Sequence, residues 1–167
     1  MLSCSGGSGT RTLSDLVPQP AYHIVDPLNQ ASRSDTTREE VERITPFLII
    51  SPSFVPDGYE PVDVEVTLPL SRDTGSEKAT KAFITFMNPA VQSVLQLTEL
   101  AGSSQTGSQS TEQVTINGKA AAFIPDDQLI GLNWGLCDRS FLLEGNPPMA
   151  TKDTLRKVAE SVKLDCD

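Results

Sequence analysis

The chain has 167 residues, of which 38% are hydrophobic and 21% charged, and its formal net charge is -9. This length suits one domain with a tail, and the composition is that of a globular protein. The acidic balance and the scattered lysines and arginines argue against binding to nucleic acid or to an anionic membrane, which needs clustered basic residues.

The first nine residues, Met1–Gly9, look like the end of a bacterial lipoprotein signal, because Ser3 precedes Cys4 and a Ser/Gly-rich run follows. The apolar region of such a signal does not precede Cys4, so either the sequence is truncated or Cys4 is an ordinary cysteine. We expect Cys4 to be lipidated. The lipid would be the chain's only membrane contact, since no apolar stretch approaches the roughly 18 residues that span a bilayer.

Residues 1–35 are rich in Ser, Gly, Pro, Asn and Asp, which predicts a flexible tether with one docked stretch at Ala21–Val25. A short helix is expected over Asp35–Ile44, where threonines can cap the first turn and acidic residues follow. Pro46 would end it.

From Phe47 onward the pattern is one of short apolar or alternating runs, which predicts strands. The expected strands are Phe47–Ile50, Val62–Leu68, Ala82–Met87, Val91–Leu97, Val114–Ile116, Lys119–Phe123, Gln128–Leu136 and Arg139–Leu143. A polar turn at Ser71–Lys78 and a mobile loop at Ala101–Glu112 interrupt them. Asn117-Gly118 is typical of a type I′ hairpin turn, because these two residues tolerate positive φ.

The chain ends in an expected amphipathic helix that starts near Lys152 and is capped by Thr151. Its apolar stripe consists of Leu155, Val158, Ala159 and Val162. We therefore predict a single α+β domain over residues 36–167, with an antiparallel, curved sheet of about six to seven strands, a short N-terminal helix and a C-terminal amphipathic helix.

Three cysteines divide naturally into a lipidated Cys4 and a disulfide between Cys137 and Cys166 in an exported protein. Such a bridge would stabilise the fold by roughly 3 kcal/mol. The alternative is that Cys137 and Cys166 are both reduced. Zinc is not expected, because no Cys-x-x-Cys pair is present and the single histidine, His23, is far away in the expected tether.

The residues predict no catalytic, metal-binding or cofactor site. His23 lies in the expected tether, which argues against Ser-His-Asp or Cys-His chemistry. The pair Asp126-Asp127 could bind a cation or a sugar, or serve a cryptic hydrolase, but adjacent acids after a hairpin usually form a solvated turn. No phosphate loop or dinucleotide fingerprint is present.

A series of motifs runs over residues 36–163: a short helix followed by a Pro-Phe strand and a Pro-x-x-x-Pro-x-Gly-Tyr turn, then a hairpin, a Trp strand, an aromatic-x-Leu-x-Gly strand and a closing helix. The corresponding segments are Val41–Phe47, Pro52–Tyr59, Val114–Ala122, Leu132–Trp134, Phe141–Gly145 and Thr151–Val162. In this order they together resemble the bacterial envelope family called domain of unknown function 4367. The charged turn, the long Gly/Ser/Gln loop, Cys137 and Cys166 depart from the family pattern.

The resemblance implies a position outside the cytoplasmic membrane, as a lipoprotein or as the outer part of an anti-sigma or sporulation-related protein, and it brings no catalytic residues. We expect a non-catalytic lipoprotein or sensor domain that meets an envelope protein or a cell-wall component. The alternative is a carrier that binds a lipid-like apolar ligand between sheet and helix. The candidate ligand-facing residues are Tyr59, Phe83, Phe86, Phe123 and Trp134, although core packing also explains Tyr59 and Trp134.

Overall fold

The structure, a computed structural model, describes residues 9–70, 79–102 and 112–166. The described residues include three helical elements: the 3-10 helix η1 (Leu13–Asp15) before the strands, α1 (Arg38–Ile44) between the second and third strands, and α2 (Lys152–Ser161) after the last strand. The strands are β1 (Ala21–Asp26), β2 (Ala31–Arg33), β3 (Glu60–Thr67), β4 (Lys81–Asn88), β5 (Ser93–Ala101), β6 (Glu112–Ile116), β7 (Lys119–Ile124), β8 (Ile130–Leu136) and β9 (Arg139–Gly145).

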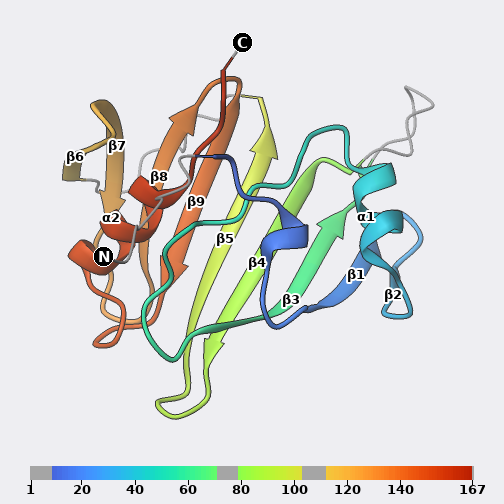
Figure 1. The fold of residues 1–167 in the computed structure, drawn as a ribbon, viewed down its shortest axis with the longest axis horizontal. Coiled ribbons are helices and arrows are strands. Elements are labelled where there is room, and N and C mark those ends of the chain that lie inside the picture. Colours follow the sequence, from blue (N-terminus) through green and yellow to red (C-terminus); the bar gives the residue numbers. More distant parts are fainter. Residues whose placement is uncertain (1–8, 71–78, 103–111, 167) are drawn as a thin grey trace, which may run out of the picture.

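All these strands form one nine-stranded sheet in the order β2-β1-β3-β4-β5-β9-β8-β7-β6 (Figure 1). β1 runs parallel to β3, with Tyr22 opposite Val64, whereas the other neighbours are antiparallel. The predicted α+β class is confirmed. The predicted count of six to seven strands and the purely antiparallel sheet were wrong, because β1 and β2 join the sheet and β1 does so in parallel.

β1 and β2 come from residues 1–35, which were predicted to form a tether with one docked stretch at Ala21–Val25. In the structure Tyr22 and Ile24 are buried, and His23 lies between them on the other face of the sheet. The connection from β1 to β3 contains β2, α1 and a coil, which is long enough for the crossover that parallel neighbours require. Cys4, the Ser71–Lys78 turn and most of the Ala101–Glu112 loop lie outside the described residues.

The two predicted helices are confirmed. Thr37 caps α1, its hydroxyl accepting the Glu40 N–H at 3.3 Å while the Glu40 carboxylate accepts the Thr37 N–H at 3.0 Å. This reciprocal pair is the capping box that satisfies exposed helix donors. Thr151 caps α2 in a similar way, through the N–H of Thr154 at 3.1 Å. The predicted apolar stripe of α2 is buried against the sheet.

The predicted hairpin is also confirmed. Asn117 and Gly118 have φ values of 50° and 79°, and Ile116 pairs with Lys119 across the turn. The predicted strand Phe47–Ile50 was wrong. It is coil, apart from an isolated bridge between Ile50 and Thr12. Ile49 and Ile50 are nevertheless buried, so they fill the core as side chains without joining the sheet.

The molecule has two layers (Figure 1). Both α-helices, η1 and the coil from α1 to β3 lie against one face of the sheet, and the hydrophobic core lies between them and that face. We call the opposite face the open face, because among the described residues no helix packs on it. Alternation along each strand decides which side chains reach the core and which reach the open face.

Candidate functional site

The five aromatic residues predicted to face a ligand do not share one surface. Phe86, Phe123 and Trp134 are 1%, 7% and 4% exposed and belong to the core. Phe83 lies on the open face, because it is one residue away from the buried Ala82 and Ile84. Tyr59 precedes β3, is half-buried, and donates its hydroxyl to Ser93 Oγ at 2.6 Å.

The layer between α2 and the sheet contains packed side chains. The rings of Trp134 and Phe141 stack with centroids 5.2 Å apart, and the Lys152 ammonium lies 5.4 Å from the centroid of the Phe123 ring. Leu155 and Val158 of α2 are 0% and 1% exposed. Trp134 therefore has the role of a core anchor, which was the structural alternative for this residue.

A pocket of about 200 Å³ lies where η1, the coil before β3 and β4 meet. Phe86 and Tyr59 line it together with Arg11, Asp15 and Val55. Drug-sized ligands usually occupy pockets of about 300–1,000 Å³. This space therefore suits a single side chain or a small molecule, and it lies away from the layer under α2 in which the carrier hypothesis placed its ligand.

The open face carries side chains in rows that the strand register defines. One row crosses β3, β4, β5 and β9 and consists of Asp63, Thr85, Gln96 and Glu144. The next row begins on β1 and consists of His23, Glu65, Phe83, Thr98, Leu142 and Asn133. Thr98 is buried and the others are half-buried. The face thus mixes acids and neutral polar groups with an aromatic and an aliphatic side chain.

The electrostatics of the open face are acidic. His23 Nδ1 pairs with the Asp63 carboxylate. Burial raises the pKa of Glu65, and the nearby Asp63 raises it further, while His23 opposes this. Burial alone raises the pKa of Glu144. Within the described residues, no group of three His, Cys, Asp or Glu side chains is placed to hold a metal ion.

The position of His23 differs from the expectation that it lies in a tether. β1 pairs it directly with Glu65, and its ring reaches Asp63, which is 40 residues away in sequence. The local signal was the alternation of buried Tyr22 and Ile24 around it. The run Ala21–Val25 was predicted as a docked stretch of the tether, but its three alternating residues between prolines were too few to predict a strand of the sheet.

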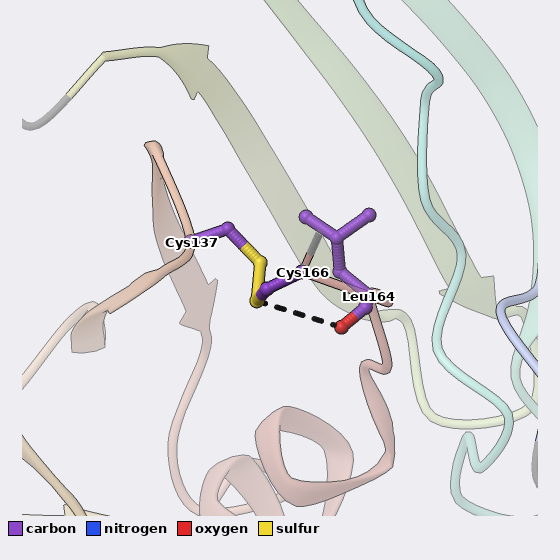
Figure 2. Close-up of a disulfide and its surroundings, with 3 residues drawn as sticks. All are labelled: Cys137, Leu164 and Cys166. Atoms are coloured by element: carbon purple, nitrogen blue, oxygen red, sulfur yellow. Dashed lines mark hydrogen bonds between the residues drawn. A yellow bond between two sulfur atoms is a disulfide. The ribbon is translucent and has the colours of Figure 1, made fainter.

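The predicted disulfide between Cys137 and Cys166 is present, with a Cα–Cα distance of 5.6 Å (Figure 2). Cys137 lies in the turn between β8 and β9 with φ of 57°, and Cys166 lies in the tail after α2. Leu164, two residues before Cys166, packs on the core. An open pocket of about 410 Å³ lies beside the bridge and is lined by both cysteines, Asp138, Arg139, Leu164 and Asp165.

Beside the turn between β8 and β9 lies an ion pair between Glu99 and Arg139, which was not predicted from the sequence. Glu99 is 2% exposed and accepts the N–H of Ile50 at 3.0 Å and the Arg139 guanidinium. Arg139 also donates to the Leu48 carbonyl and lies 5.2 Å from the centroid of the Phe47 ring. Burial raises the pKa of Glu99 to about 7, against the effects of Ile50 and Arg139. The sequence feature that could have revealed this pair is an acid at a core-facing strand position, two residues after Leu97.

Asp126 has a structural role in the turn after β7. Its Oδ1 accepts the N–H groups of Gln128 at 2.8 Å and Leu129 at 3.1 Å, and these bonds lower its pKa. The side chain thus closes a local turn of the kind that Asp commonly forms. This arrangement agrees with the solvated-turn interpretation of the Asp126-Asp127 pair.

No protein family model matches the chain, and no curated protein is similar to it in sequence. The likeness to the domain of unknown function 4367 family therefore stays a prediction that rests on the motifs themselves. Of the helices in the described ranges, none has the length and apolar character needed to cross a membrane.

Proposed function

We propose that this chain is a non-catalytic, extracytoplasmic domain of the bacterial cell envelope, anchored through a lipid on Cys4, that binds an envelope protein or a cell-wall component. The observation that carries the proposal is the Cys137–Cys166 disulfide. Disulfides persist in exported proteins and are rare in the reducing cytosol. Both cysteines are exposed, so reductants would have access to the bridge.

The expected lipid anchor on Cys4 and the family likeness both support an extracytoplasmic location. Ser3, Cys4 and the Ser/Gly run that follows fit the end of a lipoprotein signal. The order of motifs from Val41 to Val162 is similar to that of an envelope family. A domain anchored in this way would bind partners that lie at the cell surface.

A binding role, as opposed to catalysis, is supported by the contents of the open face. Its one histidine bonds to Asp63, and no described hydrogen bond brings a serine, threonine or cysteine to the His23 ring. Nucleophilic catalysis of the Ser-His or Cys-His kind needs that contact. Half-buried polar and apolar side chains over several strands instead form a broad surface of the kind that partners cover.

The carrier is the second candidate, and the observation on its side is a pocket at Phe86 and Tyr59, whose volume of about 200 Å³ suits only a small molecule. Two of the five predicted ligand-facing residues line that space. The packed layer around Trp134, Phe141 and α2 favours the interaction domain instead, because a carrier of a lipid-like ligand needs a larger internal volume.

Intact mass spectrometry tests the location. The protein should be expressed in a lipoprotein-processing bacterium with the sequence that precedes it in its genome, and weighed before and after reduction. We expect diacylglycerol and acyl groups on Cys4 and a mass gain of two hydrogen atoms when the disulfide is reduced. A Cys4→Ala variant, as the matched control, should lack the lipid mass and keep the disulfide. An unmodified, fully reduced wild-type chain would contradict the proposed location.

A further inference from the structure

The acids of the open face gather at two places. Asp63 and Glu65 lie on β3, and Glu144 lies on β9. We call these the β3 pole and the β9 pole. Neither Glu65 nor Glu144 has a hydrogen bond or an ion pair with another described residue, although both are half-buried. A partly desolvated carboxylate without a cation is unfavourable, and a cation brought by a partner would relieve this cost.

Basic side chains on this face are few and lie at its margins. His23 is on β1, next to the sheet edge, and is paired with Asp63. Lys81 is the first residue of β4, where it is exposed. The face therefore has an acidic excess around its two poles, and charge complementarity favours a cationic occupant.

The surface between the two poles carries uncharged side chains, some of which are apolar. Phe83 on β4 and Leu142 on β9 lie in one row, with Thr98 of β5 between them. In the neighbouring row, Gln96 donates to Thr85 Oγ1 at 3.4 Å. An occupant that spans both poles would therefore place an apolar group near the ring of Phe83.

The spacing of the poles fits an extended chain. β3 and β9 are separated by β4 and β5, hence by three strand spacings, which is about 14 Å at roughly 4.8 Å each. Glu65 and Glu144 lie in neighbouring rows, two residues apart along the strands, so their backbone positions are roughly 16 Å apart. The long side chains of Lys or Arg cover the difference between this distance and the spacing along a peptide. In an extended peptide, residues i and i+4 point to the same side and lie about 13.6 Å apart at roughly 3.4 Å per residue. Residue i+2 points to that side as well, midway between the two.

We propose that the open face binds an extended cationic segment of a partner protein, with two Lys or Arg residues four positions apart at the two poles and an apolar residue between them. This inference rests on the proposed binding function and names the chemistry of its partner. The two basic side chains would lie against Glu65 and Glu144. The apolar residue would contact Phe83.

The test is an NMR titration of the full ¹⁵N-labelled chain at low ionic strength. The probe is the capped peptide Lys-Ser-Leu-Ser-Lys, and the matched probe Lys-Lys-Ser-Leu-Ser has the same composition with adjacent lysines. We expect the first peptide to shift the amide signals of β3, β4, β5 and β9 with the higher affinity. Glu65→Gln/Glu144→Gln should weaken its binding by about tenfold, if each lost ion pair contributes near the upper end for exposed pairs.

The control variant removes the same charge elsewhere. Glu39→Gln/Glu42→Gln alters exposed acids of α1, on the other side of the sheet, and should change the affinity by less than about twofold. Equal loss in both double variants, or equal binding of both peptides, would overturn the proposal in favour of general charge attraction. Dispersed amide spectra of both variants establish that they are folded.

A neutral chito-oligosaccharide serves as the third probe. If it shifts the open-face signals and the peptides do not, the cationic occupant is wrong while the proposed binding function stands. If neither kind of probe shifts these signals, the open face is not the binding surface. The lipid and disulfide masses still report on the envelope location independently.

Discussion

Glu99 is an acid that follows two apolar core-facing residues of β5, Leu95 and Leu97. Its carboxylate joins Arg139 of β9 to the N–H of Ile50, while Arg139 joins β9 to the Leu48 carbonyl. The coil Phe47–Ile50 is thus attached to the sheet by polar groups that lie within the core. Removing one partner of a buried ion pair leaves an uncompensated charge and is strongly destabilising.

The pKa of Glu99 predicts a pH dependence of stability. Burial raises it from 4.5 to about 7, so between these values the folded chain binds more protons than the unfolded chain. The free energy of unfolding should then fall as pH rises through this window, by up to about 3 kcal/mol from this group. Urea denaturation at pH 5 and pH 8 measures it.

Glu99→Gln is the comparison for this prediction, because an amide can accept the Ile50 N–H but cannot ionise. The variant should lose the part of the fall between pH 5 and pH 8 that Glu99 contributes, whatever its absolute stability. The part from Glu65 and Glu144, whose pKa values burial also raises, should remain. The same slope in wild type and variant would show that Glu99 is ionised throughout, as a carboxylate stabilised fully by Arg139.

At the scale of elements, the turn between β8 and β9 carries two constraints at one residue. Cys137 has a φ of 57°, which favours glycine, and it is also the site of the bridge to Cys166. The bridge fixes the tail after α2, and with it Leu164, against the core. The disulfide thus holds in place a turn that its own backbone conformation disfavours.

Two disulfide-free variants separate these constraints. Cys137→Ser/Cys166→Ser should lose about 3–4 kcal/mol of stability, because the bridge joins residues 29 positions apart. Cys137→Gly/Cys166→Ser should lose about 0.5–1 kcal/mol less, since glycine adopts positive φ without strain. Guanidinium denaturation monitored by circular dichroism measures both. Equal stability of the two variants would mean that the turn relaxes once the bridge is gone.

Elements with strong local signals were predictable from the sequence. The capping residues of α1 and α2, the stripe of α2 and the Asn117-Gly118 turn each determine their own structure within a few residues. The Phe47–Ile50 segment was not predictable in this way. An apolar run can fill a core as coil when a distant group, here Glu99, accepts its N–H.

Within the candidate site, the sequence predicted the partners Cys137 and Cys166 because few pairings were possible. It did not predict the open face. Which residues share that face depends on the register of strands far apart in sequence, such as Glu65 beside His23 and Glu144 beside Gln96. Registers of this kind are determined by packing across the whole sheet.

At the scale of the whole molecule, β1 decides where the domain begins. Ile24 is 6% exposed and lies in the core next to β3, whereas Val25 points to the open face. If residues 1–35 were only a tether, substitutions at either position would leave stability unchanged. If β1 is a full member of the sheet, Ile24→Ala should cost about 2–4 kcal/mol, as buried aliphatic truncations do.

Val25→Ala is the matched control, since it shortens a side chain on the same strand that is half-buried on the other face. It should cost less than about 1.5 kcal/mol. Urea denaturation with tryptophan fluorescence measures both variants, because Trp134 lies in the core on β8, far from β1 along the sheet. A large loss for Ile24→Ala at this distant reporter would show that β1 and the C-terminal strands unfold as one cooperative unit. An unchanged midpoint would place the start of the domain after β1.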